Sequence, residues 1–101
     1  MNRLSSAPGT IERPDLDDRG LEAIDPPYIV TVFDNDYNTV VEVITILMIA
    51  TQCDLEEAQM ETWEIHHLGR SVVHRASFED CLAAAEIIRT IGIHVEVTCD
   101  A

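Results

Sequence analysis

Two short polar clusters contain residue types that can bind an amino group. The first is Asp34-Asn35-Asp36, and the second is His66-His67. Carboxylate oxygens, amide oxygens and a neutral imidazole nitrogen all accept hydrogen bonds, so together they suit an ammonium group with its three N–H donors. They do not suit an anion. Asp and Asn also dominate turns, and from spacing alone a plain turn is the favoured interpretation of the first cluster.

The elements around the first cluster can be predicted from the neighbouring residues. Residues 28–33 are rich in β-branched and aromatic side chains and end at the cluster, which predicts a strand followed by a turn. Asn38 is a good helix N-cap, and residues 39–51 carry apolar side chains at helical spacing. Their β-branched residues would suit a strand, but the segment is long for one. We therefore expect a mostly buried helix here.

The second cluster lies at the end of another predicted helix. Asp54 and Glu57 have the spacing of a capping box, and apolar residues then recur on one helical face. Gly69 is placed to end this helix, because glycine readily adopts the left-handed backbone conformation of a C-terminal cap. The two histidines of the cluster therefore fall in the last turn.

The remaining residues complete the predicted fold. Residues 70–75 are short and β-prone, Ser77 and Asp80 predict the start of a third helix that ends at Gly92, and residues 93–98 alternate strictly as a final strand. The order β-α-α-β-α-β predicts an α+β sandwich. In this fold, a three-stranded antiparallel sheet packs against three helices on one face.

The composition limits the partners. The chain of 101 residues has a formal net charge of −13, and its six basic residues are all arginine. Binding to nucleic acid draws on clustered basic residues, so we expect no nucleic-acid partner. No apolar run approaches the roughly 20 residues that span a bilayer, and the first residues do not resemble a signal peptide. We expect no membrane contact and a cytoplasmic location.

The two parts of the chain differ in composition. Residues 1–27 carry six acids and three arginines with few adjacent apolar residues, which indicates a flexible N-terminal extension. Residues 28–101 carry thirteen acids and three arginines. The predicted folded domain, residues 28–101, is therefore itself strongly acidic.

The histidines and cysteines do not form a recognisable metal-binding or catalytic pattern. Cys53, Cys81 and Cys99 are widely spaced without a Cys-x-x-Cys pair, and adjacent histidines on a helix point in different directions. We expect reduced, mostly buried thiols, no metal and no cofactor. A hydrolase built on Asp36 and His66 would lack a nucleophile, so we expect no enzymatic activity.

Two separated motifs and the order of the elements point to a known family. The first motif, at residues 28–39, is Tyr-x-Val-x-Val-Phe-Asp-Asn-Asp-Tyr-Asn-Thr, and an apolar helix follows it. The second, at residues 65–70, is Ile-His-His-Leu-Gly-Arg. Over residues 28–98 the sequence resembles the bacterial Clp protease adaptor family, ClpS. That family has a strand, Asn-Asp-Asp-Tyr/Phe, a helix and Val-His-x-x-Gly-Lys/Arg in the same order.

The resemblance implies an adaptor of the N-end rule. Such an adaptor binds the free α-amino group and the large hydrophobic first side chain of a substrate protein. It delivers the substrate to the N-terminal domain of a Clp AAA+ unfoldase of the ClpA or ClpC type. The residues implied to hold the α-amino group are Asp34, Asn35, Asp36 and His66, and those implied to contact the peptide or shape its pocket are Asn38, Val40, Thr62, Ile65 and Val95.

The resemblance also implies a docking surface for the unfoldase. Glu79 matches an acidic docking position of the family, whereas Ala84 stands at a position that is basic in the family. The extension, residues 1–27, would enter the unfoldase channel.

Several departures from the family pattern concern specificity. Asp34-Asn35 reverses the usual Asn-Asp pair, and Val40 and Thr62 replace two methionines. Shorter pocket side chains imply weaker exclusion of substrates that begin with Ile or Val. The same departures support an alternative from another class, a divergent protein-interaction domain that docks on a partner without reading N-termini.

Overall fold

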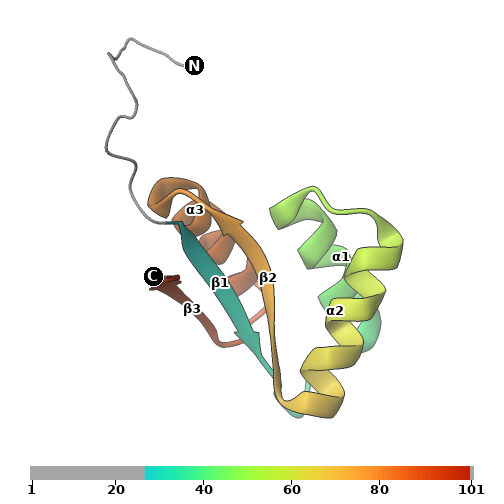
Figure 1. The fold of residues 1–101 in the computed structure, drawn as a ribbon. Coiled ribbons are helices and arrows are strands. Elements are labelled where there is room, and N and C mark those ends of the chain that lie inside the picture. Colours follow the sequence, from blue (N-terminus) through green and yellow to red (C-terminus); the bar gives the residue numbers. More distant parts are fainter. Residues whose placement is uncertain (1–26, 101) are drawn as a thin grey trace, which may run out of the picture.

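The computed structural model describes residues 27–100 and contains three strands and three helices (Figure 1). The strands pair antiparallel in the order β2-β1-β3. The predicted order β-α-α-β-α-β and the α+β class are confirmed. The predicted N-terminal extension lies almost wholly outside the described residues. The elements are β1 (Tyr28–Phe33), α1 (Val40–Thr51), α2 (Leu55–Leu68), β2 (Arg70–Ala76), α3 (Phe78–Arg89) and β3 (Val95–Cys99).

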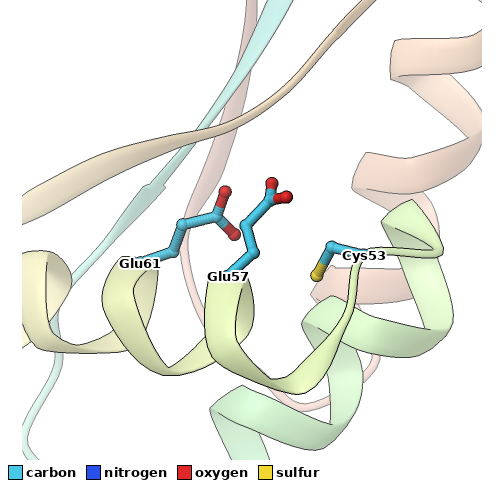
Figure 2. A group of neighbouring side chains, drawn as sticks. All are labelled: Cys53, Glu57 and Glu61. Carbon is cyan, nitrogen blue, oxygen red and sulfur yellow. The ribbon is translucent and has the colours of Figure 1, made fainter.

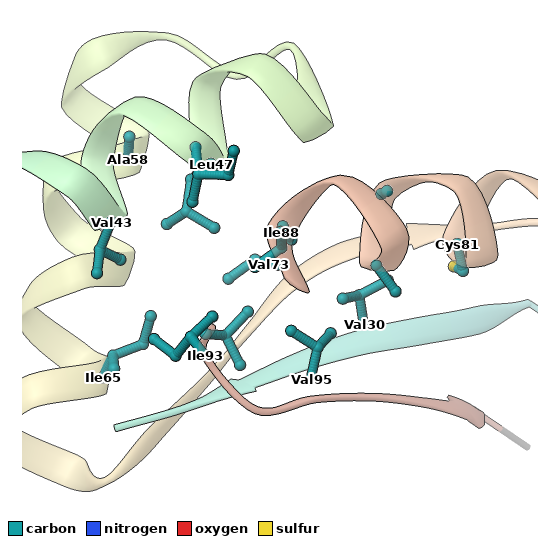
Figure 3. Packing of buried hydrophobic residues seen from close by; sticks show 14 residues of the cluster. Val30, Val43, Leu47, Ala58, Ile65, Val73, Cys81, Ile88, Ile93 and Val95 are labelled. Carbon is teal, nitrogen blue, oxygen red and sulfur yellow. The ribbon is translucent and has the colours of Figure 1, made fainter. Parts of the chain in front are cut away.

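One face of the sheet packs against the helices (Figure 3). Alternate side chains of β1, Val30 and Val32, are fully buried on this face, as the period-two geometry of a strand requires. The intervening side chains of β1 border an open depression of about 630 Å³. Burial of apolar area between the sheet and the helices supplies the main stabilisation of the domain. The largest fully buried side chains are Leu47, Ile65, Ile88, Val30, Val32, Val43, Thr62 and Cys81.

The start of α1 differs by one residue from the prediction. Thr39, not Asn38, is the N-cap: its hydroxyl accepts from the Glu42 backbone N–H at 3.1 Å, and the Glu42 carboxylate accepts from the Thr39 N–H at 2.8 Å. This reciprocal capping box satisfies two backbone donors that the helix leaves unpaired. The Asn38 side chain is used elsewhere: its Oδ1 accepts from the Asn35 amide at 2.6 Å, and its amide donates to the Ile91 carbonyl across the fold.

The other boundaries follow the sequence closely. Asp54 and Ser77 cap α2 and α3 as predicted, and Gly69 ends α2 at φ 92°. The last helix ends earlier than predicted, at Arg89, and the last strand begins later, at Val95. A turn with Gly92 at φ 84° separates them, and the chain must leave this turn before it can pair with β1.

Candidate functional site

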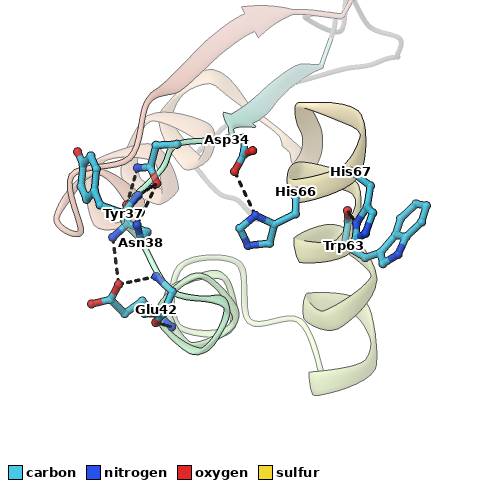
Figure 4. A network of polar contacts seen from close by, with 9 residues as sticks. Asp34, Tyr37, Asn38, Glu42, Trp63, His66 and His67 are labelled. Carbon is cyan, nitrogen blue, oxygen red and sulfur yellow. Dashed lines mark hydrogen bonds and ion pairs between the residues drawn. The ribbon is translucent and has the colours of Figure 1, made fainter.

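The two polar clusters predicted from the sequence meet at one end of the sheet (Figure 4). The backbone N–H of Asp34, just past β1, donates to the Gly69 carbonyl at 3.0 Å and so ties the loop after β1 to the end of α2. His66 lies one turn before that end. Its Nδ1 is 3.1 Å from the Asp34 carboxylate Oδ1, although the two residues are 32 positions apart in sequence. The fold therefore holds an imidazole and a carboxylate within hydrogen-bond distance.

The surroundings of His66 indicate how its ring is protonated. Nε2 is buried and has no hydrogen-bond partner among the described residues, whereas Nδ1 faces a carboxylate. A buried N–H without an acceptor is rarer than a buried lone pair without a donor. In the neutral ring, the network therefore assigns the hydrogen to Nδ1, which donates to Asp34, and the lone pair to Nε2. Asp34 thus fixes both the tautomer and the orientation of the imidazole.

Asn35 and Asn38 build the loop between β1 and α1. The Asn35 side-chain oxygen accepts from the backbone N–H groups of Tyr37 at 3.3 Å and Asn38 at 3.0 Å, which is an Asx-turn arrangement. The Asn35 amide donates to the Asn38 side-chain oxygen at 2.6 Å. The plain-turn interpretation therefore applies to Asn35, whose polar atoms are used inside the loop. The turn leaves Asp34 at one end, beside His66.

The same loop is anchored to the turn after α3. The Asn38 amide donates to the Ile91 carbonyl at 2.9 Å, and the Tyr37 hydroxyl donates to the Gly92 carbonyl at 2.7 Å. The Asn38 amide also donates to Glu42 at 3.2 Å. The hydrogen bond from the Thr39 backbone, followed by the one from Asn38, lowers the pKa of the Glu42 carboxyl. These contacts hold the start of α1 in place against the turn after α3.

An apolar groove of about 310 Å³ lies between α1 and α2 beside His66. The Thr62 hydroxyl donates to the Ala58 carbonyl at 2.7 Å, so its polar hydrogen is satisfied within α2 and not offered to the groove. Trp63 and His67, which also line the groove, stack with ring centroids 4.5 Å apart (Figure 4). His66 therefore joins the polar pair to the groove. The lining residues are Val40, Ile44, Gln59, Thr62, Trp63, His66 and His67.

The structure separates the predicted site residues into groups. Val40, Thr62 and His66 line the groove, and Asp34 contacts His66. Ile65 and Val95 belong to the buried core, at 0% and 2% exposure, and neither is among the groove-lining residues. The Asn35 side chain is used within the loop, and the Asn38 side chain bonds to Asn35, Glu42 and Ile91.

The remaining predicted residues lie apart from the groove. Asp36 is exposed on the loop and makes no side-chain hydrogen bond within residues 27–100. Glu79 is exposed in the first turn of α3.

Three lining residues, Ile44, Gln59 and Trp63, were not expected from the sequence, whereas His67 belongs to the second polar cluster. Ile44 lies one turn after Val40 on α1, and Gln59, Trp63 and His67 lie on α2 at steps of four residues. Residues four apart share one helical face, so helical periodicity anchored on Val40 and His66 could have found them. The sequence pattern instead drew attention to the core-facing apolar positions.

The fold and the site together define a small α+β domain that holds an acceptor-rich pair beside an apolar groove. A family model described as ATP-dependent Clp protease adaptor protein ClpS matches residues 23–95. The chain belongs to the ClpS family of Clp protease adaptors. The expected family is thus confirmed, and the family is one of adaptors rather than catalytic enzymes.

A solved structure has the same fold. The structure of Agrobacterium tumefaciens ClpS2 bound to L-phenylalaninamide superposes with a TM-score of 0.71 and 14% sequence identity, over 76% of this chain and 100% of that one. At this identity the likeness concerns the fold. No curated protein sequence matches the chain significantly. Within residues 27–100, no helix is long and apolar enough to cross a membrane.

Proposed function

We propose that the groove binds the first residue of substrate proteins that have a free α-amino group and a large hydrophobic side chain. As a Clp adaptor, the protein would then deliver these substrates to a Clp AAA+ unfoldase. The observation that carries this proposal is the contact of Asp34 with His66 at 3.1 Å, at the edge of an apolar groove. The Agrobacterium relative is bound to an amino acid amide that has a free amino group and an aromatic side chain.

The α-ammonium would bind next to Asp34 and His66. Asp34 is partly exposed, at 35% for its side chain, so its carboxylate can reach an incoming cation while its partner holds it in position. A charge-assisted hydrogen bond to a carboxylate is about twice as strong as a neutral one. In the usual family pair the first position is Asn, so Asp34 would replace a neutral acceptor with a charged one. Asp36, exposed on the same loop, would add negative potential.

The start of α1 would otherwise repel a cation. A helix N-terminus carries a partial positive charge, and α1 begins at Val40, beside the groove. The carboxylates of Asp34 and Glu42 offset this charge locally. Lowering of the Glu42 pKa by its capping hydrogen bonds keeps that carboxyl ionised over a wider pH range. The site therefore favours a cationic peptide end over an acetylated one.

The groove has the size and character for one side chain. A volume of about 310 Å³ is at the lower end of the range for small-molecule pockets, which suits a single large residue. Val40 and Ile44 supply aliphatic surface from α1, and Trp63 supplies aromatic surface from α2. Val40 is shorter than the Met of the usual family pattern, so β-branched first residues, Ile and Val, should be excluded less strongly.

Delivery would use a separate surface. Glu79 and its neighbour Phe78 are both exposed at the start of α3, where Phe78 is 48% exposed. An acidic residue beside an exposed aromatic one suits a basic, partly apolar surface on a partner protein. We assign to this position the contact with the N-terminal domain of a Clp unfoldase. It lies on a different helix from the groove.

Peptide titration tests the proposal. Fluorescent peptides that begin with Phe, Leu or Ile and are otherwise identical are titrated with the full chain, each with a free and with an acetylated N-terminus. We expect Phe and Leu peptides to bind and acetylation to abolish binding. Asp34→Ala should weaken binding on the order of tenfold or more, because a charged hydrogen bond is lost. Glu86→Gln, an exposed change on α3, is the control for net charge. Equal binding of free and acetylated peptides would refute the proposal.

A further inference from the structure

Cys53, Glu57 and Glu61 form a second cluster of chemically active side chains (Figure 2), and none of them lines the groove. Cys53 lies in the connection between α1 and α2, and the two glutamates lie one turn apart on α2. One ligand atom from each residue, the thiol sulfur and a carboxylate oxygen of each glutamate, lies within 4.8 Å of the other two. Glu57 and Glu61 are four residues apart and share one face of α2, and the thiol of Cys53 approaches them from the preceding connection.

Glu61 is the unusual member of this cluster. Its side chain belongs to the buried polar residues at 8% exposure, and its Oε1 has no hydrogen-bond partner in the described part of the chain. Within residues 27–100, no arginine or histidine forms an ion pair with Glu57 or Glu61. A buried carboxylate is costly unless it is paired, protonated or bound to a metal. Burial and the neighbouring Glu57 raise the pKa of Glu61 to about 8.

We propose that Cys53, Glu57 and Glu61 bind one divalent transition-metal ion, with Zn²⁺ the best match to the donor set. Zn²⁺ takes thiolate sulfur at about 2.3 Å and carboxylate oxygen at about 2.0–2.2 Å. Three atoms within 4.8 Å of one another can converge on one ion through small side-chain rotations. Mg²⁺ and Ca²⁺ prefer oxygen ligands alone, so the thiolate favours zinc.

The surroundings agree with an accessible site. Glu57 is exposed, Cys53 is half-buried and Glu61 is buried, so solvent can reach one side while Glu61 closes the other. Binding would release the thiol proton and the proton shared by the carboxyl groups, and the ion would take the place of that proton. A water molecule would complete a four-coordinate shell. The ion would join the α1–α2 connection to the middle of α2.

The sequence did not suggest this site, because its ligands are of mixed types. Neither a pair of cysteines nor a histidine is involved, and two of the three residues resemble ordinary solvent-exposed acids of a helix. The expectation that the thiols are mostly buried holds for Cys81, whereas Cys53 is intermediate and Cys99 is exposed. Only the packing of α2 shows that Glu61 is removed from water.

Metal titration of the full chain tests the proposal. The reduced protein is stripped with EDTA, the chelator is removed, and Co²⁺ is added while the thiolate-to-cobalt charge-transfer absorption is recorded. Zn²⁺ is then titrated in competition and by calorimetry. We expect one ion per chain and an absorption band that Zn²⁺ abolishes. Cys53→Ser should remove the band, and Glu61→Gln and Glu57→Gln should each weaken binding on the order of tenfold or more.

Two controls separate this site from others. Cys99→Ser removes an exposed thiol outside the cluster and should leave the band and the affinity unchanged. Circular dichroism of each variant checks folding, and Glu57→Gln alters only an exposed side chain, so it keeps the test valid if a buried variant unfolds. At the same Zn²⁺ concentration, the rise in melting temperature should be larger in the wild type than in Glu57→Gln. Absence of saturable binding, or a band that survives Cys53→Ser, would overturn the proposal.

Discussion

The buried carboxyl of Glu61 should make the stability of the metal-free protein fall as the pH rises. Burial, together with the hydrogen bond and charge of Glu57, raises the pKa of Glu61 from 4.5 to about 8 in the folded state. Because the folded pKa exceeds the unfolded one, the folded state binds the extra proton. This contribution to stability is complete below about pH 4.5 and is lost as the pH rises to about 8.

The size of the effect follows from the shift. Between the two pKa values, one proton separates the folded and unfolded states, which corresponds to about 1.4 kcal/mol per pH unit. From about pH 6 to about pH 9 the loss is therefore about 2 to 3 kcal/mol, since it levels off above the folded pKa. Glu61→Gln keeps a similar shape, cannot ionise, and should lack this loss. Glu57→Gln should reduce the loss in part, because Glu57 contributes to the raised pKa.

Urea denaturation at the two pH values, with EDTA present, measures the effect. At each pH, the free energy of unfolding of Glu61→Gln is subtracted from that of the wild type. The change in this difference between the two pH values reports on Glu61, because the other titrating groups contribute equally to both proteins. Glu86→Gln, on an exposed face of α3, is the matched control and should behave as the wild type. If wild type and Glu61→Gln lose the same stability between about pH 6 and about pH 9, Glu61 does not hold the proton and the reasoning fails.

Two further predictions concern the groove and the loop. Val40→Met should raise the preference for Leu over Ile first residues several-fold in anisotropy titrations with matched peptides, and an unchanged ratio would show that residue 40 does not set it. Thr39→Ala should lower the free energy of unfolding by about 1 kcal/mol, because the α1 cap is lost, and urea denaturation with Thr90→Ala as a comparison measures this.

Local signals in the sequence were sufficient to predict the elements of the fold. The strand over residues 28–33, the caps at Asp54 and Ser77 and the end of α2 at Gly69 all depend on a few neighbouring residues. Such signals act within one or two turns of the chain, so they can be read without knowledge of the tertiary structure. The N-cap of α1 was misplaced by one residue, because the Asn38 side chain bonds to Asn35 through its oxygen and, through its amide, to Ile91, 53 positions away.

Site residues were predictable in type but not in arrangement. The sequence identified Asp34 and His66, and the family resemblance joined them, but spacing alone favoured a plain turn. In the structure, the Asn35 side chain forms that turn. The Asp34 carboxylate lies 3.1 Å from Nδ1 of His66. Ile65 is fully buried rather than at the groove surface, because its side chain packs into the core cluster between the helices and the sheet.

By itself, the sequence determined the class of fold, the family and the acidic, acceptor-rich character of the two loop clusters. These depend on residue type and local spacing, which the chain carries in any conformation. Only the tertiary structure decided which polar groups face one another and which are removed from water. Glu61 shows this most clearly, since it has the local pattern of an exposed helical acid and is 8% exposed. The electrostatics of a carboxyl group depend on what packs around it, and that packing is set by residues distant in sequence.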